Sequence, residues 1–206
     1  MIFAGLDLSG YKQKSKTVLS FIEGKDISVY KGLEDDDIIK LISIKKDVIL
    51  AIDSPLSFPK KNYFRYSDKK LRKFLERKNL SYLKKFVLPP FLPGMKILTK
   101  RGIKIKNSLK GVKVIETHPT ISIFLILYEN NLELKDFLKY KRNLQTFKEL
   151  QRILEKILGY ELKFEIPDEL DSFICAYISF LFYKKEKIYY LSKTLSPFVI
   201  YNPFKL

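Results

Sequence analysis

The sequence predicts an α/β protein with a mixed five-stranded sheet, flanking helices and a basic insertion after the fourth strand. Two observations lead to this prediction. Three short apolar runs each end in an acidic residue followed by a turn, as in DVILAIDSPL at 47–56. The expected order is three strands, a helix, a strand, a basic segment, a strand and then helices. A three-strand meander followed by strands reached through crossovers gives a sheet with antiparallel and parallel pairs.

The first part of the chain supplies four of the five strands. Residues 2–8, 16–23 and 26–31 are predicted as strands, the last two joined by the tight connection EGKD. Residues 34–46 are predicted as a helix, because the segment starts with acidic residues, which a helix N-terminus favours. Residues 47–53 form an apolar, β-branched run typical of a buried strand, and Pro55 ends it because proline has no N–H to donate.

Residues 54–111 have a different composition, rich in Lys, Arg, aromatic residues and prolines. One helix is predicted within them, with Ser67 as its N-cap and Leu71, Phe74 and Leu75 on one face. We interpret this segment as an insertion into a single domain of residues 1–206. The next buried strand, at 112–116, needs the earlier strands as partners.

The C-terminal part is predicted to be mostly helical. A helix is expected from Pro119 through residue 126, and another from Thr146 to Leu158, with a Thr146–Glu149 capping box and Gly159 as the C-terminal stop. The last helix follows Pro167 and has apolar residues at helical spacing. Residues 189–191 and 198–201 are predicted as short strands.

Composition excludes several classes of protein. No apolar run approaches the roughly 20 residues that span a bilayer, and Asp7 interrupts the N-terminal run, so no signal peptide is expected. A single cysteine excludes an internal disulfide, and one cysteine with one histidine excludes a Cys/His zinc site. The expectation is a soluble cytoplasmic protein.

The positive charge is concentrated in one part of the chain. Residues 60–113 hold 18 of the 39 Lys and Arg but only 2 of the 23 acidic residues, so the rest has 21 of each sign and the segment carries the whole net charge of +16. Such concentration favours a polyanionic partner, most often nucleic acid. Lys-rich composition of the heat-adapted kind, which mixes Lys with Glu, describes the remainder of the chain but not this segment.

Three strand ends are predicted to bring carboxylates together. If strands 2–8, 47–53 and 112–116 are the parallel set, Asp7, Asp53 and Glu116 emerge at one edge of the sheet. Neighbouring strands lie about 4.8 Å apart, so these carboxylates could share a cation. Oxygen-only ligands select hard divalent ions such as Mg²⁺ or Mn²⁺. For any single one of these residues, a solvated strand end or a helix cap is the simpler interpretation.

Several stretches together resemble an uncharacterised family of predicted RNase H-like nucleases, within the RNase H-like superfamily. They are GLDLSG (5–10), AIDSPL (51–56), RYSDKKLRK (65–73), RG (101–102), IETHP (115–119) and DSFICAY (171–177). The resemblance implies an RNase H-like sheet and a metal-dependent nuclease. By position, it implies that the catalytic and metal-binding residues are Asp7, Asp53, Glu116 and Asp171. It also implies that substrate is contacted by Arg65, Asp68, Arg72 and Arg101.

The residues themselves leave alternatives open at several positions. Asp168 lies one helical turn before Asp171 and is a rival ligand, although helix capping explains it better. His118 could contact phosphate or only hydrogen-bond a loop. Lys69 and the neighbouring cations and rings of 63–73 combine phosphate-binding charge with surfaces for base stacking. The arginines could instead be structural, paired with acids such as Asp68.

Three functions are therefore carried forward. The leading one is a Mg²⁺- or Mn²⁺-dependent nuclease acting on DNA or RNA through a two-metal site. The second is a non-catalytic nucleic-acid-binding protein. The third is an ATP-dependent phosphotransferase of the actin/sugar-kinase type, suggested by GLDLSG but lacking a second glycine-rich phosphate loop.

Overall fold

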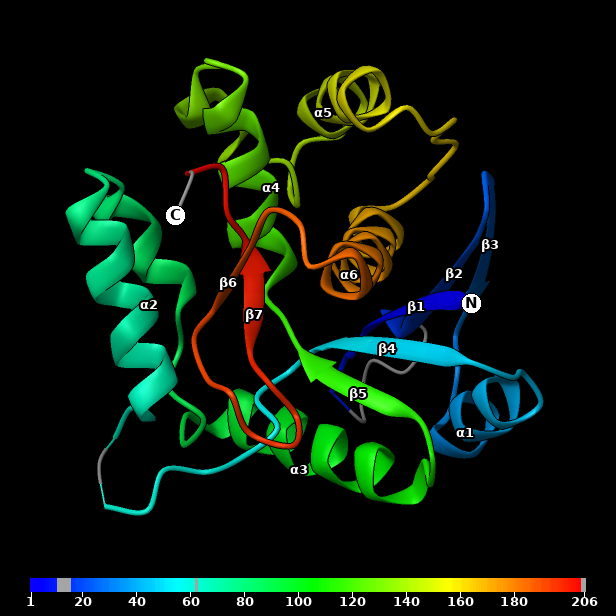
Figure 1. The fold of residues 1–206 in the computed structure, drawn as a ribbon. Coiled ribbons are helices and arrows are strands. Elements are labelled where there is room, and N and C mark those ends of the chain that lie inside the picture. Colours follow the sequence, from blue (N-terminus) through cyan, green and yellow to red (C-terminus); the bar gives the residue numbers. More distant parts are fainter. Residues whose placement is uncertain (11–15, 62, 205–206) are drawn as a thin grey trace.

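A computed structural model describes residues 1–10, 16–61 and 63–204 (Figure 1). Its central sheet has the strand order β3-β2-β1-β4-β5. The strands are β1 (Ile2–Asp7), β2 (Val18–Glu23), β3 (Asp26–Lys31), β4 (Val48–Asp53) and β5 (Lys113–Glu116). β1, β2 and β3 are antiparallel neighbours, whereas β4 runs parallel to both β1 and β5. The predicted α/β class and the mixed five-stranded sheet are confirmed.

Helices cover both faces of the sheet, as Figure 1 shows. One face, with Phe3, Ala51 and Ile115, packs against α4 (Pro119–Glu129) and α6 (Pro167–Lys184). The other face, with Leu6 and Ile52, packs against α1 (Asp35–Ser43) and α3 (Pro93–Ser108). The alternation of side chains along each strand therefore divides the core into two layers.

A glycine in β1 sets the distance between the sheet and α6. A Cβ atom on Gly5 would lie only 2.0 Å from the carbonyl oxygen of Ser172 and 2.1 Å from the backbone nitrogen of Ala176. Any larger residue would push the α6 backbone away from β1. Gly5 thus brings the N-terminal half of α6 against the strand that ends in Asp7.

The basic segment contains more regular structure than the sequence predicted. The expected helix is α2 (Tyr66–Arg77), but its N-cap is Arg65 and Asp68 caps it, not Ser67. A 3-10 helix (Ser81–Phe86) and α3 follow. The prediction missed α3 because two glycines and dense lysines obscure its helical pattern, although Pro93 occupies its first turn, where proline is favoured.

The C-terminal elements agree with the prediction except at one cap. α5 (Leu144–Leu158) starts two residues before Thr146, and the Asn143 side chain accepts a hydrogen bond from the Thr146 N–H, so the predicted Thr146–Glu149 capping box is wrong. Gly159 ends α5 in the left-handed region, as predicted. A 3-10 helix (Leu134–Phe137) precedes α5, and β6 (Ile188–Tyr190) pairs with β7 (Val199–Tyr201).

Within residues 1–10, 16–61 and 63–204, no helix combines the length and apolar character needed to cross a membrane.

Candidate active site

The ends of β1 and β4 place two aspartates side by side. Asp7 and Asp53 are the last residues of these neighbouring parallel strands and are partners in the register. Register partners point to the same face of a sheet, and neighbouring strands lie about 4.8 Å apart, so the two side chains are adjacent. The structure thus brings Asp7 and Asp53 together, as the strand pattern predicts.

α6 adds a third carboxylate to this pair. Asp171 is fully buried and is close enough to interact electrostatically with Asp7 and Asp53. The Tyr140 hydroxyl donates a hydrogen bond to Asp171 Oδ1 at 2.7 Å, and the Lys141 ammonium forms an ion pair with Asp171 Oδ2. The carboxylate of Asp171 is therefore positioned by two neighbours from the segment before α5.

Asp168, the rival to Asp171, also belongs to this group. The capping role expected for it is wrong, because Glu169 Oε2 accepts the hydrogen bond from the Ile166 N–H at the start of α6. Asp168 instead lines the cleft that contains Asp7. Burial and the charge of Asp171 raise the pKa of Asp168.

Glu116, predicted to join the metal ligands, is engaged elsewhere. In the register it pairs with Ile52, one residue before Asp53, so the two acids point to opposite faces of the sheet. Both Glu116 oxygens accept hydrogen bonds from the Arg65 guanidinium, at 2.7 and 2.6 Å, and one also accepts from the Leu56 N–H at 2.8 Å. Glu116 is therefore committed to Arg65, although it lines one small pocket together with Asp53, and its charge adds to the burial that raises the pKa of Asp53. Its part in a metal site stays a prediction.

The aspartate group carries more negative charge than a buried site favours. Burial raises the pKa of Asp7 well above its ordinary value, and the charges of Asp171 and Asp53 raise it further. Burial also raises the pKa of Asp53, against the lowering effect of His118 and Lys141. Carboxylates that repel one another in this way favour a cation between them.

Lys141 supplies part of that positive charge. Burial disfavours its ammonium, but Asp171 and the other nearby acidic groups outweigh burial and raise its pKa. Lys141 is thus a cation across the physiological pH range. One ammonium beside Asp7, Asp53 and Asp171 leaves the group net negative when all three are ionised.

The aspartates lie in a cleft of about 950 Å³ with a basic rim. Asp7, Asp53 and Asp168 line it, while Asp171 lies behind Tyr140 and Lys141. The basic residues that line the cleft are Lys16, Lys85, Lys135, Lys139, Lys141 and Arg142. An acidic floor with a basic rim can receive an anion while holding a cation beneath it.

Most of this rim was missed in the sequence. Four of the six basic residues come from residues 135–142, in the run KDFLKYKR, outside the segment that holds the net charge. The run is not visible when the charge is summed over all residues outside 60–113, because that sum is zero. The signal that could have revealed it is local: the run has four basic residues and one acidic residue, Asp136.

Two polar atoms near the cleft, Thr117 Oγ1 and His118 Nδ1, have no hydrogen-bond partner among the described residues. A third buried atom, Asp171 Oδ2, accepts no hydrogen bond there but forms the ion pair with Lys141. His118 Nε2 lies 3.0 Å from the Phe86 carbonyl oxygen, which can only accept, so Nε2 carries a proton. In the neutral imidazole, Nδ1 is then an unshared acceptor. Buried polar atoms without partners are rare and point to a ligand or water.

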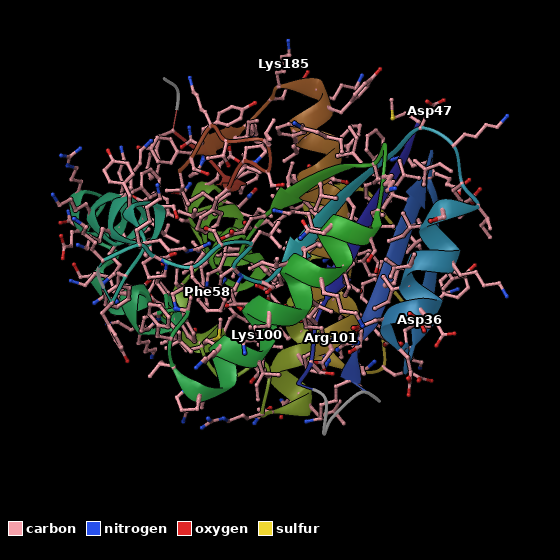
Figure 2. All side chains as sticks on the ribbon, turned by 90° about the horizontal axis from the view of Figure 1, so that it is seen from below. Asp36, Asp47, Phe58, Lys100, Arg101 and Lys185 are labelled. Carbon is pink, nitrogen blue, oxygen red and sulfur yellow. The ribbon has the colours of Figure 1, made fainter. Side chains whose placement is uncertain are left out.

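The arginines predicted to contact substrate are structural instead. Arg101 is fully buried, and its guanidinium binds Asp35 Oδ1 at 2.6 Å, the Ser9 carbonyl oxygen at 2.7 Å and Thr17 Oγ1 at 2.8 Å. Figure 2 labels it beside its neighbour on α3, the exposed Lys100. Its burial excludes contact with substrate in this conformation.

Arg65 and Arg72 are likewise committed to the protein. Arg65 is buried between Glu116 and Asp68, with 2.6 Å from Nη2 to an oxygen of each acid. Arg72 donates to the Lys84 carbonyl oxygen at 2.8 Å and stacks on Phe64. The structural alternative left open for these arginines therefore fits the geometry, whereas Lys69 remains exposed on α2.

The aspartate group suits a hard divalent cation in chemistry and charge. Its donors are carboxylate oxygens, and a cation would relieve their mutual repulsion. In the described parts of the chain, no three His, Cys, Asp or Glu side chains are already gathered closely enough to hold an ion. The Lys141 ammonium on Asp171 would have to move aside for a third ligand to join Asp7 and Asp53.

The chain was compared with family models, curated proteins and solved structures, and none matches it. The chemistry of the cleft is therefore the basis for a function.

Proposed function

We propose that the cleft hydrolyses phosphodiester bonds of DNA or RNA with the aid of Mg²⁺ or Mn²⁺. The observation that carries this proposal is the convergence of Asp7, Asp53 and Asp171 beneath a rim of six basic residues. The resemblance to RNase H-like nucleases agrees with it, since a three-strand meander followed by parallel strands is the arrangement expected there. Glu116 is replaced in the proposed ligand set by Asp168, which lines the cleft.

Asp7 and Asp53 would hold the cation between their adjacent carboxylates, with Asp171 or Asp168 as further ligands. A bound Mg²⁺ or Mn²⁺ supplies a water of lowered pKa and neutralises charge on the phosphoryl oxygens. The basic rim binds the phosphates on either side of the scissile bond and holds the strand over the aspartates.

Two side chains of the cleft could assist this reaction, one by accepting a proton and the other through its charge. His118 Nδ1, an acceptor without a partner among the described residues, can take a proton from a water positioned near Asp53. Lys141 remains charged and can stabilise negative charge that develops on the phosphate. Both roles require only the placement of groups that already line the cleft.

The experiment is a cleavage assay with labelled single-stranded DNA, single-stranded RNA and duplex, with Mg²⁺, Mn²⁺ or EDTA. Wild-type protein should cleave at least one substrate with a divalent ion and none with EDTA. Asp7→Asn and Asp53→Asn should each lower the rate by more than the roughly 10–100-fold that loss of a residue merely supporting a ligand costs.

A matched control removes a carboxylate far from the cleft. Asp36, exposed in the first turn of α1 (Figure 2), is suitable, and Asp36→Asn should leave cleavage unchanged. If wild-type protein binds the oligonucleotides but cleaves none of them with either ion, the chain is a binding protein and the proposed hydrolysis is wrong.

A second assay, with ATP in place of nucleic acid, distinguishes the nuclease from the phosphotransferase alternative. A kinase of the actin/sugar-kinase type would bind ATP with Mg²⁺ and release ADP without any nucleic acid. The proposal predicts no ATP-dependent thermal stabilisation beyond that given by Mg²⁺ alone. ADP formation that depends on Asp7 would favour the kinase instead.

A further inference from the structure

A second basic groove lies between α2 and the C-terminal hairpin of β6 and β7. It encloses about 620 Å³ and shares no lining residue with the aspartate cleft. Five cations line it, all from one helix and its cap: Lys69, Lys70, Lys73, Arg77 and Lys78. No acidic residue lines it in the described part of the chain. The groove is therefore a strongly positive concavity separate from the proposed active site.

The cations of the groove fall into two groups. Lys70 donates to the Tyr190 carbonyl oxygen at 2.7 Å, and Lys78 lies 3.7 Å above the Phe204 ring, so both are held by the protein. Lys69, Lys73 and Arg77 are exposed and form no salt bridge within the described residues. These three recur every four residues, so they form a line along α2 with steps of about 6 Å.

Aromatic rings complete the groove. Phe74 stacks on Tyr189 with ring centroids 4.8 Å apart, and Phe204 packs against the edge of Phe74. Tyr66 is 80% exposed and lines both this groove and the neighbouring pocket formed with Phe58 and Lys60. A ring so exposed at the mouth of a basic groove has one face free to stack on a planar group.

We infer that this groove binds a single strand of nucleic acid, with phosphates along Lys69, Lys73 and Arg77 and a base stacked on Tyr66. A line of cations beside aromatic rings is the combination that proteins use to hold single strands without sequence preference. A duplex offers phosphates but hides the faces of its bases, and a membrane is flat where this surface is concave. The inference rests on the proposed function: if the cleft cleaves nucleic acid, this groove anchors the substrate strand outside the active site.

The test measures binding with EDTA present, so that no cleavage is needed. The ligand is a labelled oligo-dT or oligo-U of about 20 nucleotides, longer than one typical site. The test variant is Lys69→Gln/Lys73→Gln/Arg77→Gln. The control is Lys40→Gln/Lys46→Gln/Arg152→Gln, which removes the same charges from exposed positions outside both the groove and the cleft.

The groove variant should weaken binding by at least tenfold, and the control should change it little. In a plot of log affinity against log salt, the groove variant should lose about 2 from the slope, because each phosphate contact to a single strand contributes about 0.7. Tyr66→Ala, which keeps every charge, should weaken binding roughly fivefold or more without changing the slope. Wild type should prefer the single strand to a duplex of equal length.

Equal loss in groove variant and control would overturn the inference, because nonspecific net charge would then explain binding. A duplex bound as tightly as the single strand and equally dependent on the groove would also overturn it, as would groove-dependent binding to anionic vesicles without binding to oligonucleotides. The proposed function fails separately. Wild-type protein that binds through the groove but never cleaves with Mn²⁺ would contradict hydrolysis alone.

Discussion

Two ionic clusters at the carboxyl ends of the parallel strands differ in how their charges are balanced. In the Arg65 cluster, one guanidinium binds Glu116 and Asp68, and most carboxylate oxygens have hydrogen-bond partners. In the aspartate cluster, the acidic groups outnumber the single ammonium of Lys141. Burial raises the pKa of Asp7 and Asp53, whereas every carboxylate oxygen of Glu116 and Asp68 accepts a hydrogen bond in the Arg65 cluster.

The difference teaches how an acidic strand end should be interpreted. Asp53 and Glu116 follow apolar strands in the same way, and both are buried or nearly so. A carboxylate whose oxygens all accept hydrogen bonds stabilises the fold. A carboxylate that is buried beside other carboxylates lowers the stability of the folded state. The second kind is the better candidate for function.

The largest expected effect comes from breaking the paired cluster. Arg65→Met should lower the free energy of unfolding by about 3–5 kcal/mol, because it leaves Glu116 and Asp68 as buried charges without their partner. Urea denaturation measures the change, and Arg77→Met, at an exposed arginine of the same helix, is the control. A loss below about 1 kcal/mol would mean that the cluster does not stabilise the fold.

A second change affects the aspartate cluster indirectly, through the packing of α6 against β1. Gly5→Ala places a Cβ atom against the backbone of Ser172 and Ala176, so α6 must shift from β1. We expect destabilisation of about 1–3 kcal/mol, the usual cost of overpacking. Cleavage should fall more than stability alone explains, because Asp171 moves with α6. Gly94→Ala in α3, whose Cβ would meet no neighbour and which does not line the cleft, is the matched control.

A double-mutant cycle measures how strongly Lys141 and Asp171 depend on each other. Lys141→Met should destabilise the protein, because Asp171 loses its ammonium partner, and adding Asp171→Asn should recover part of that loss. We expect a coupling energy of about 1–2 kcal/mol from thermal or urea denaturation. Additive effects would show that the ion pair contributes nothing to stability.

The smallest expected effect has the opposite sign. The pKa of Asp7 is raised in the folded state, so the folded protein binds a proton more tightly than the unfolded chain, and stability falls as pH rises above the ordinary value of 3.8. Asp7→Asn removes this cost. In EDTA it should raise the free energy of unfolding by about 1 kcal/mol near neutral pH, and the gain should vanish at acidic pH.

Adding Mn²⁺ sharpens the same comparison. Wild-type protein should gain stability from the ion by mass action, and Asp7→Asn should gain little. If Asp7→Asn is less stable than wild type in EDTA at neutral pH, the carboxylate is not under the electrostatic strain inferred from its surroundings.

Much of the fold could be predicted because local patterns decide it. The β-branched run of β4, the acidic start of α1 and the helical spacing of α6 each specify an element without reference to distant residues. α3 was missed because its pattern is diluted by lysines that face solvent and by Gly102, whose close approach to Ser54 Oγ is a tertiary feature.

The site could be predicted only in part. Asp7 and Asp53 follow from strand ends and parallel pairing, which sequence patterns reveal. The parity of Glu116 relative to Asp53 depends on the register of β5, and a shift of one residue reverses the face. The arrival of Lys141 beside Asp171 depends on how a connecting segment folds back over α6, and no local pattern encodes that.

Arg101 has a consequence for protein engineering. Its guanidinium joins three elements of the fold: it binds Ser9, two residues after β1, Thr17, immediately before β2, and Asp35 in the first turn of α1. A shortened chain that bridges β4 to β5 directly would delete Arg101 and leave the buried Asp35 carboxylate without its main partner. Residues 54–111 are therefore not a transplantable module. A minimal version of this protein would have to replace that guanidinium before Arg101 could be removed.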